Sequence, residues 1–293
     1  MSHNHIITPL HAPHFLFHNQ RMLNFCGSDP LGLSSHPDLK KNAIRFILQY
    51  GLSSASQFLV SGELSCEAGI RKKLSDLLGT ESVLLFSSNE AAKKALIMCE
   101  SPASSTNLHS LGAVADGNDA LLCIDEQSNF DLRSHLEADL LLGSFMTLFG
   151  IPGSYLAGSF AVLERISSMQ PPSHERALTP SSLGAIDAAL DLFPGMNGER
   201  AELRQKIHFL QQQLEALRLK TRSIGHCIII YFETKEEADQ VEQNLQYAGI
   251  WTKRTVETAI TLSICLQHRT EHLNVLVEEL GRILFHSYTT TKL

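Results

Sequence analysis

The sequence predicts an α/β protein whose larger part contains a mostly parallel sheet, followed by a smaller C-terminal α+β part. Three observations support this prediction. Short apolar runs without polar alternation are interleaved with helical patterns, which is typical of strands buried on both faces of a parallel sheet. A Pro-Gly pair at residues 194–195 interrupts the pattern and marks a domain boundary. The chain has 293 residues, which is enough for about two domains.

The N-terminal residues are polar and rich in histidine, and we expect residues 1–36 to form an arm rather than a domain. Five histidines lie before residue 19, without an Asp, Glu or Cys among them. A flexible arm does not hold side chains in fixed positions, so we expect no metal site. No basic segment followed by an apolar one is present there, so we also expect no signal peptide.

The large domain is expected over residues 37–195. Helices are predicted where apolar residues recur every three or four positions. They span residues 38–50, 66–78, 90–98, 161–169 and 181–192. Strands are predicted at the short apolar runs 82–86, 120–124, 139–143 and 155–158.

The small domain is expected over residues 196–293. Its predicted helices span residues 198–219, 235–247 and 270–286, and its predicted strands span 226–232 and 258–266. Strands followed by helices, without a regular β-α alternation, favour an α+β layer with antiparallel pairing.

Composition excludes several classes of function. The net charge is −7 and the cations are scattered, so we expect no binding to nucleic acid or to an anionic membrane surface. No apolar run approaches the ~20 residues needed to cross a bilayer. The six cysteines form no CxxC pair, which is typical of buried thiols in a reducing compartment. We therefore expect a cytoplasmic protein.

General sequence motifs identify little chemistry. No GxG pair exists, which excludes the dinucleotide fingerprint, and no Walker A, HExxH or GxSxG motif is present. Asp125 ends an apolar run, where α/β sheets place ligand-binding groups, although such a residue also caps the next element in many proteins. The glycine-rich segment 150–158 enters a predicted strand and is equally compatible with a tight turn.

Several segments together resemble one enzyme family. Residues 23–37 (LNFCGSDPLGLSSHP) are similar to the opening motif of the α-oxoamine synthases, which are fold-type I enzymes that depend on pyridoxal phosphate (PLP). This family includes 8-amino-7-oxononanoate synthase. Further matches lie at residues 50–62, 84–88, 124–126, 143–150 and 155–159. The resemblance covers most of residues 21–285 and implies a three-layer αβα large domain with a small C-terminal domain.

The family's lysine is absent from this chain. The resemblance aligns the motif Thr-Phe/Leu-Ser-Lys-Ala-Leu-Gly with residues 144–150 (SFMTLFG), which places Thr147 at the lysine position. All eleven lysines lie outside residues 95–205, so none can take its place. In the family this amine binds PLP covalently and transfers protons, so its loss removes several orders of magnitude in rate. We name no residue as catalytic.

The resemblance implies four candidate cofactor-binding residues: Asp125, Ser88, Asn89 and Ser144. Asp125 aligns with the acidic partner of the pyridine nitrogen. The phosphate-binding triplet Ser-Gly-Tyr/Phe has become Ser88-Asn89-Glu90, which removes a glycine and adds a negative charge.

Other family residues are replaced or missing. The Asp-Glu-Ala-His segment now ends in Ser128, and Phe58 and Ser263 stand at the two arginine positions. Only residues 101–119 occupy the interval that normally carries the ring-stacking histidine. His109 is the one histidine in it, and its neighbours do not match. We therefore expect a deletion near residues 100–120 and a sheet with fewer strands.

These replacements favour a degenerate homologue of the α-oxoamine synthases that catalyses nothing and acts by binding a partner or a ligand. The alternative is an active PLP-dependent acyltransferase, or aminotransferase-like enzyme, that holds PLP without a covalent bond. A gene product with no retained role, or a different chemistry, also stays open. The resemblance further implies a homodimer, or a heterodimer with a lysine-bearing paralogue.

Overall fold

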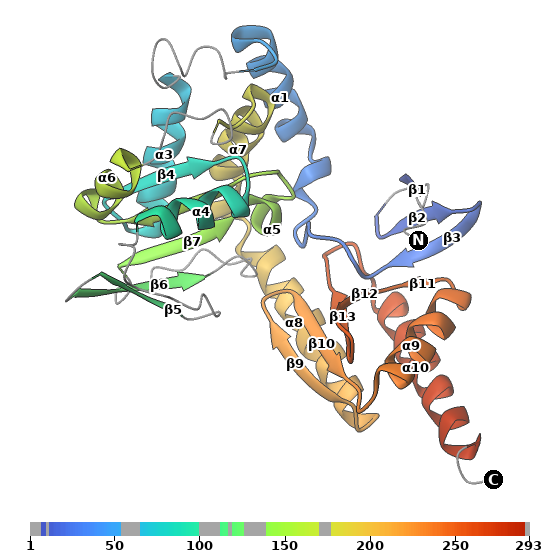
Figure 1. Cartoon of the computed structure of the whole chain (residues 1–293). Coiled ribbons are helices and arrows are strands. Elements are labelled where there is room, and N and C mark those ends of the chain that lie inside the picture. The colour runs from blue at the N-terminus through green and yellow to red at the C-terminus, as the bar shows by residue number, and fades with distance from the viewer. Residues whose placement is uncertain are drawn as a thin grey trace. The chain divides into compact units, whose positions relative to one another are not determined.

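The structure is a computed structural model of the chain, shown in Figure 1. It describes residues 7–9, 12–53, 65–99, 112–116, 119–125, 139–169 and 177–290. The chain divides into two compact units. Leu33–Met196 forms one, called here the large unit. Met1–Gly32 and Asn197–Leu293 together form the other, called the small unit.

The large unit contains a five-stranded sheet in the order β4-β8-β7-β6-β5. These strands are β4 (Ser82–Phe86), β8 (Ser154–Gly158), β7 (Leu140–Ser144), β6 (Asp119–Asp125) and β5 (Gly112–Asp116). Strands β4, β7 and β6 run in one direction, whereas β8 and β5 run in the other. The four apolar runs that predict strands all lie in this sheet, whereas β5 was not expected.

The expected predominance of parallel pairing is not observed in the described sheet. Only β6 and β7 pair in parallel, while β4–β8, β8–β7 and β6–β5 are antiparallel. The short connections explain the difference. A parallel pair needs a crossover of a dozen or more residues. Only two residues separate β5 from β6, and β7 is joined to β8 by residues 145–153, which include the short helix α5 (Phe145–Phe149).

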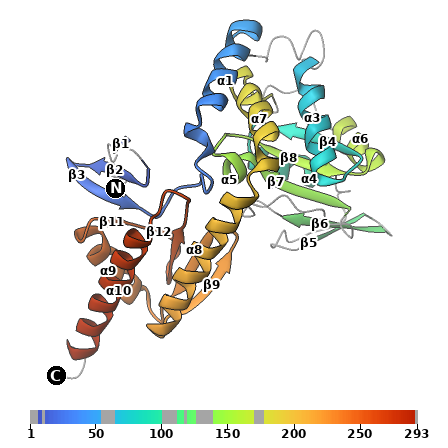
Figure 2. The same cartoon turned by 180° about the vertical axis from the view of Figure 1, so that it is seen from behind.

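Helices cover both faces of this sheet, as Figures 1 and 2 show from opposite sides. α4 (Asn89–Cys99) and α6 (Phe160–Ser168) pack together on one face. α3 (Ser65–Leu78) and α7 (Pro180–Leu192) lie on the other, and α1 (Pro37–Tyr50) packs along α7. The α/β fold predicted from the sequence is confirmed, with its three layers.

The core under α4 and α6 explains why these strands show no polar alternation. Its buried members come from every second residue of the strands and from the two helices: Phe86, Ala92, Ala95, Leu96, Leu140, Leu142, Leu156, Leu163 and Ile166. The intervening strand residues, such as Val83, Leu141 and Ala157, are also buried. Both faces of each strand therefore need apolar side chains.

The small unit contains an antiparallel sheet in the order β12-β13-β10-β9. Its strands are β9 (Lys220–Ile224), β10 (Cys227–Tyr231), β12 (Lys253–Val256) and β13 (Ala259–Ser263), and its helices are α8 (Asn197–Ala216), α9 (Lys235–Tyr247) and α10 (Thr270–Thr290). β10 and β13 are the two strands that the sequence predicted. β9 and β12 were missed, because their residues are mostly polar.

The described part of the expected N-terminal arm is folded. Its strands β1 (Ile7–Pro9), β2 (His14–Phe17) and β3 (Gln20–Asn24) form a sheet that continues, in parallel, to β11 (Ile250–Trp251). Residues 1–32 therefore belong with the C-terminal residues, and not to a separate arm. The reason is burial: Phe15, Met22 and Phe25 are 6%, 1% and 0% exposed.

In the described part of the chain, no helix is both long enough and apolar enough to cross a membrane.

Candidate functional site

The predicted site residues come together at one edge of the large unit's sheet. Because β4, β7 and β6 run in the same direction, their carboxyl ends lie at this edge, where β8 begins. Phe86, Ser154 and Ser144 occupy one row across β4, β8 and β7. Asp125 ends β6 opposite Leu142. We call this region the carboxyl edge.

Thr147 lies inside α5, immediately after the carboxyl end of β7. It is 8% exposed, and its helix neighbours Phe145 and Phe149 are fully buried. Gly150 ends the helix in the left-handed conformation, with φ of 67°, and its N–H donates to the Met146 carbonyl. The short helix therefore places a hydroxyl, and no amine, at the position that the resemblance assigns to the family lysine.

Aromatic side chains fill the space beside this helix. Tyr155 is 1% exposed, and its ring lies 5.3 Å from that of Phe145. It also lies directly against Gly143 in the neighbouring strand: a Cβ there would be 2.0 Å from the Tyr155 ring. Sequence reasoning missed this packing. In the sequence, this packing is indicated only by a glycine and a tyrosine that face each other on adjacent strands. That pair can be recognised only after the pairing of β7 with β8 is known.

Backbone N–H groups at the N-terminus of α4 already have hydrogen-bond acceptors within the chain. The Ser88 hydroxyl accepts a hydrogen bond from the Ala91 N–H at 3.1 Å. The buried Ser154 hydroxyl donates to the Ser88 carbonyl at 2.8 Å. Hydrogen bonds from the Glu90 backbone N–H and then from Ser88 lower the pKa of the Glu90 carboxyl. A carboxylate of the protein therefore interacts with the helix N-terminus, where the family binds phosphate.

Asn89 stands where the family has glycine. Among the described residues, its Oδ1 atom is buried without a hydrogen-bond partner. This carbonyl oxygen only accepts hydrogen bonds, so the Nδ2 group is the part of the side chain that could donate one to a phosphate.

The described residues at the carboxyl edge do not fit PLP as the resemblance implies it. Thr147 cannot form an imine, and Glu90 would bring a negative charge close to a phosphate dianion. Ser144 is 2% exposed and begins α5 without a side-chain capping bond, so it supplies at most one hydroxyl. We derive no reaction step through PLP at this edge.

Several predicted positions lie outside the described residues. These are Phe58, Ser128, His109 and the proposed deletion near residues 100–120, apart from the strand segments within it. The backbone of Asp125 is described, but the position of its carboxylate is not. Ser263, at a family arginine position, lies in β13 of the small unit, 6% exposed, with its hydroxyl 3.5 Å from Cys227 Sγ.

The small unit buries a histidine that sequence reasoning did not single out. His268 is 1% exposed and stacks on Phe25 with ring centroids 4.3 Å apart. Its Nε2 donates to the Asn24 carbonyl at 2.9 Å, and its Nδ1 accepts from the Cys265 N–H at 3.0 Å. Burial lowers the pKa of His268 to about 4 and raises the pKa of Cys265 to about 11. This pair is therefore neutral and structural, and it anchors the Asn24-Phe25 segment that carries the resemblance.

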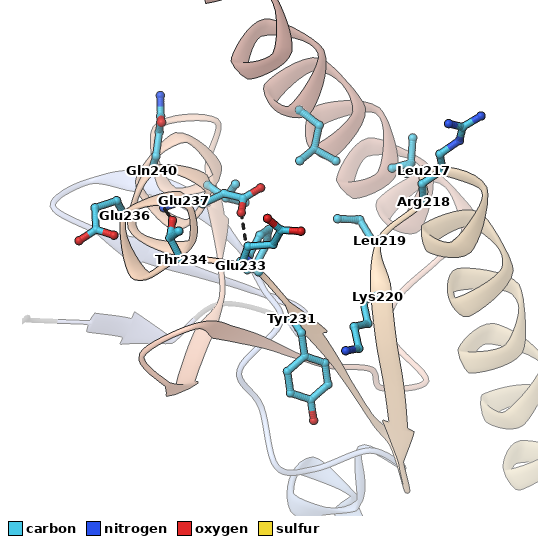
Figure 3. A pocket seen from close by; sticks show the side chains of 13 residues that line it. Leu217, Arg218, Leu219, Lys220, Tyr231, Glu233, Thr234, Glu236, Glu237 and Gln240 are labelled. Carbon is cyan, nitrogen blue, oxygen red and sulfur yellow. Dashed lines mark hydrogen bonds between the residues drawn. The ribbon is translucent and has the colours of Figure 1, made fainter. Parts of the chain in front are cut away.

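A separate pocket of about 990 Å³ lies in the small unit, between the start of β9 and the start of α9 (Figure 3). Leu217 and Leu219 line one side, and Glu233 and Glu237 line another. Glu237 is the third helical residue after the cap Thr234, and it accepts from the Glu233 N–H at 3.2 Å. Its carboxylate therefore has a structural role. In the described ranges, no three His, Cys, Asp or Glu side chains are arranged to hold a metal ion.

Comparisons with known proteins agree with the resemblance. No family model matches the chain. The 8-amino-7-oxononanoate synthase of a Marinomonas species is 22% identical in an alignment of 356 positions, gaps included, which covers 93% of this chain and 88% of that enzyme. The 8-amino-7-oxononanoate synthase of Trichlorobacter lovleyi is 42% identical over 86 residues, which cover 29% of this chain and 22% of that enzyme.

Solved structures show the same fold. Serine palmitoyltransferase of Sphingomonas wittichii superposes with a TM-score of 0.81, at 14% identity, over 96% of this chain and 92% of that one. The 8-amino-7-oxononanoate synthase of Francisella tularensis gives 0.74, at 15% identity, over 91% and 99%. The chain therefore has the fold of these enzymes, and its sequence is similar to those of 8-amino-7-oxononanoate synthases.

Proposed function

We propose that this chain keeps the fold of the α-oxoamine synthases without their reaction, and acts by binding a partner or a ligand. One observation carries the proposal. Thr147 occupies the lysine position inside the buried helix α5, and the sequence holds no lysine between residues 95 and 205. Without an amine at this place, neither the covalent bond to PLP nor the lysine's proton transfers can occur.

The N-terminus of α4 supports the same conclusion. Ser88 caps this helix, and Glu90 brings its own carboxylate to the backbone N–H groups. An arriving phosphate would have to displace these bonds and tolerate the charge of Glu90. The protein has thus lost the covalent anchor and has weakened the anion site as well.

The proposed partner is another polypeptide subunit, either a second copy or a lysine-bearing relative. In such an assembly this chain would supply a stable surface and the relative would supply the chemistry. The free cysteines described in the structure, for example Cys26 and Cys265, have pKa values raised by burial. They support our expectation of a reducing, cytoplasmic compartment.

A second candidate is a PLP enzyme that holds its cofactor without a covalent bond. One observation favours it: Asp125 ends β6 at the same edge as Ser88 and Ser144. One of the similar solved structures is described as SPT with the PLP internal aldimine, so that protein holds PLP covalently and supports only the place of the cofactor. In this candidate, Asp125 would pair with the pyridine nitrogen and Ser88 with the phosphate.

A PLP titration separates the two candidates. The purified chain is mixed with excess PLP, and the absorbance spectrum, borohydride trapping and the thermal midpoint are recorded. The Marinomonas 8-amino-7-oxononanoate synthase serves as the positive control. We expect no aldimine band, no trapped adduct and no thermal shift. A lysine adduct would overturn the proposal, and a thermal shift without an adduct would support the non-covalent enzyme.

A further inference from the structure

The outer face of α1 carries large apolar side chains that the described part of the chain leaves exposed. Ile44, Leu48 and Leu52 are 58%, 82% and 80% exposed. Ile44 and Leu48 are four residues apart and form a ridge on α1, and Leu52 follows just past the end of the helix. Such a continuous set is unlike the single exposed apolar residues that occur on any surface.

The core does not need this face, because α1 packs through its opposite side. Leu39 and Phe46 are the buried residues of the helix, and α1 packs against α7. Asn42 donates to the Gly184 carbonyl at 2.7 Å and to Asp187 at 3.2 Å. The inner side thus explains why residues 37–50 form a helix in this unit, and it leaves the ridge without a structural role.

Cations flank the ridge. Lys40, Lys41 and Arg45 are exposed on α1, and Arg45 lies 3.9 Å from Asp187. Asp38 is the only acid of the helix, and no further acid follows in the sequence until Glu63. This local positive charge contrasts with the net charge of −7 for the whole chain. We call the ridge together with these cations the α1 face.

We propose that the α1 face docks an acidic amphipathic helix of a different protein chain. This inference rests on the proposed function, and it names the partner chemistry and the surface involved. Apolar residues spaced by four form the ridge that packs into the groove of another helix. Acidic residues beside that groove would pair with Lys40 and Lys41.

Charge argues against the other occupants. An α1-to-α1 contact with a second copy would bring the same cations together, with only Asp38 on each helix to pair with them. An anionic lipid surface would attract the exposed lysines weakly and would bury only a narrow apolar ridge, which is short of what stable anchoring requires.

The test measures binding of the full chain to a labelled synthetic helix of about 20 residues, built from leucine and glutamate with leucines on one face. The matched control peptide replaces every glutamate with lysine. We expect the acidic peptide to bind and the basic one not to bind. Binding should weaken as salt is added, because the lysines are exposed.

Variants assign the binding to the α1 face. Ile44→Gln/Leu48→Gln should weaken acidic-peptide binding about tenfold or more, and Lys40→Glu/Lys41→Glu should do the same. These side chains are exposed, so circular dichroism should show an unchanged fold. Tyr247→Gln, at an 84% exposed residue of α9, is the control and should bind as the parent chain does.

Three results would overturn the inference. They are equal binding by the Ile44→Gln/Leu48→Gln variant, a dimer in sedimentation velocity that this variant abolishes, or binding to phosphatidylserine vesicles in place of the peptide. The PLP titration is independent of these measurements. If an aldimine forms while the acidic peptide still requires the α1 face, the proposed function fails and the surface stands.

Discussion

Single residues at the carboxyl edge carry the prediction that this chain differs from the enzymes that it resembles. Thr147 and Ser88 could be placed from sequence alone, because both belong to short motifs next to strands that the apolar runs predict. Their contacts could not. The donation from Ser154 to the Ser88 carbonyl joins residues 66 positions apart, and it depends on β8 lying beside β4.

Restoring a lysine at position 147 should destabilise the fold. Thr147 is 8% exposed beside buried aromatic rings, so an ammonium there would lose water without gaining a described anionic partner. We expect Thr147→Lys to lower the free energy of unfolding by about 2–4 kcal/mol. Thr147→Val, the control of similar size, should lower it by about 1 kcal/mol. Urea unfolding measures both, and a fully stable Thr147→Lys variant that traps PLP would contradict this account.

His268 should make the protein less stable in acid. Its folded pKa is about 4, below the ordinary value of 6.5, because the buried ring is held neutral. The unfolded chain therefore binds more protons between these values, and stability falls as the pH drops through this window. We expect a loss of about 2 kcal/mol between pH 7 and pH 5.

The control is His268→Gln, which removes only this contribution. Burial also lowers the pKa values of His14 and His272, so part of the pH dependence should remain in the variant. Urea unfolding at the two pH values gives the comparison. The same slope in both proteins would show that His268 does not contribute.

At the scale of elements, the apolar runs predict where strands lie, but not how they pair. The runs at 82–86 and 139–143 match β4 and β7 to within one residue. Their partner β8 is antiparallel to both, because β7 and β8 are joined by a short connection and not by a long crossover. The direction of a strand depends on the segment that connects it to the previous one. The sequence of residues 145–153 does not by itself predict whether that connection is a turn or a crossover.

Close contact between β7 and β8 leads to a sharp prediction. A methyl group at Gly143 would lie 2.0 Å from the Tyr155 ring, which is itself fully buried. We expect Gly143→Ala to lower the free energy of unfolding by about 3 kcal/mol. Gly69→Ala is the control: its Cβ meets nothing within 4 Å, and it lies inside α3. The free energy of unfolding of the Gly69→Ala variant should rise by about 0.5–1 kcal/mol. Equal stabilities would exclude this packing.

Asp187 joins three helices of the large unit. From α7 it contacts Lys73 of α3 at 2.6 Å and Asn42 of α1 at 3.2 Å. It is 19% exposed, whereas Asp191, which also contacts Lys73, is 61% exposed. We expect Asp187→Ala to lower the free energy of unfolding by about 1–2 kcal/mol and Asp191→Ala by less than about 0.5 kcal/mol. Urea unfolding checks the ranking, and a larger effect of Asp191 would reverse it.

On the scale of the whole molecule, the small unit is built from the two ends of the chain. Leu23 N–H donates to the Gly249 carbonyl and Ser263 N–H donates to the Phe25 carbonyl, each at 2.7 Å. The N-terminal hairpin is therefore a structural part of this unit. Sequence patterns miss it, because its short strands are stabilised by partners more than 200 residues away.

The single tryptophan reports on this hairpin. Phe15 is 6% exposed and packs edge-on against Trp251 at 5.7 Å. We expect Phe15→Ser to shift the Trp251 emission to longer wavelength and to lower the free energy of unfolding by about 3 kcal/mol. Phe160→Ser, at a 60% exposed residue of the other unit, should change neither. An unchanged emission in Phe15→Ser would place the hairpin away from Trp251.

The sequence by itself determined most of the helices, four strands of the large unit's sheet and the absence of lysine between residues 95 and 205, because helix periodicity, apolar runs and residue identity are local properties. The tertiary structure alone decided which strands pair, that the N-terminal residues join the small unit, and that Glu90 and Ser88 satisfy the N-terminus of α4. It also decided that Ile44, Leu48 and Leu52 are exposed. Burial depends on contacts between distant residues, and a local pattern does not contain them.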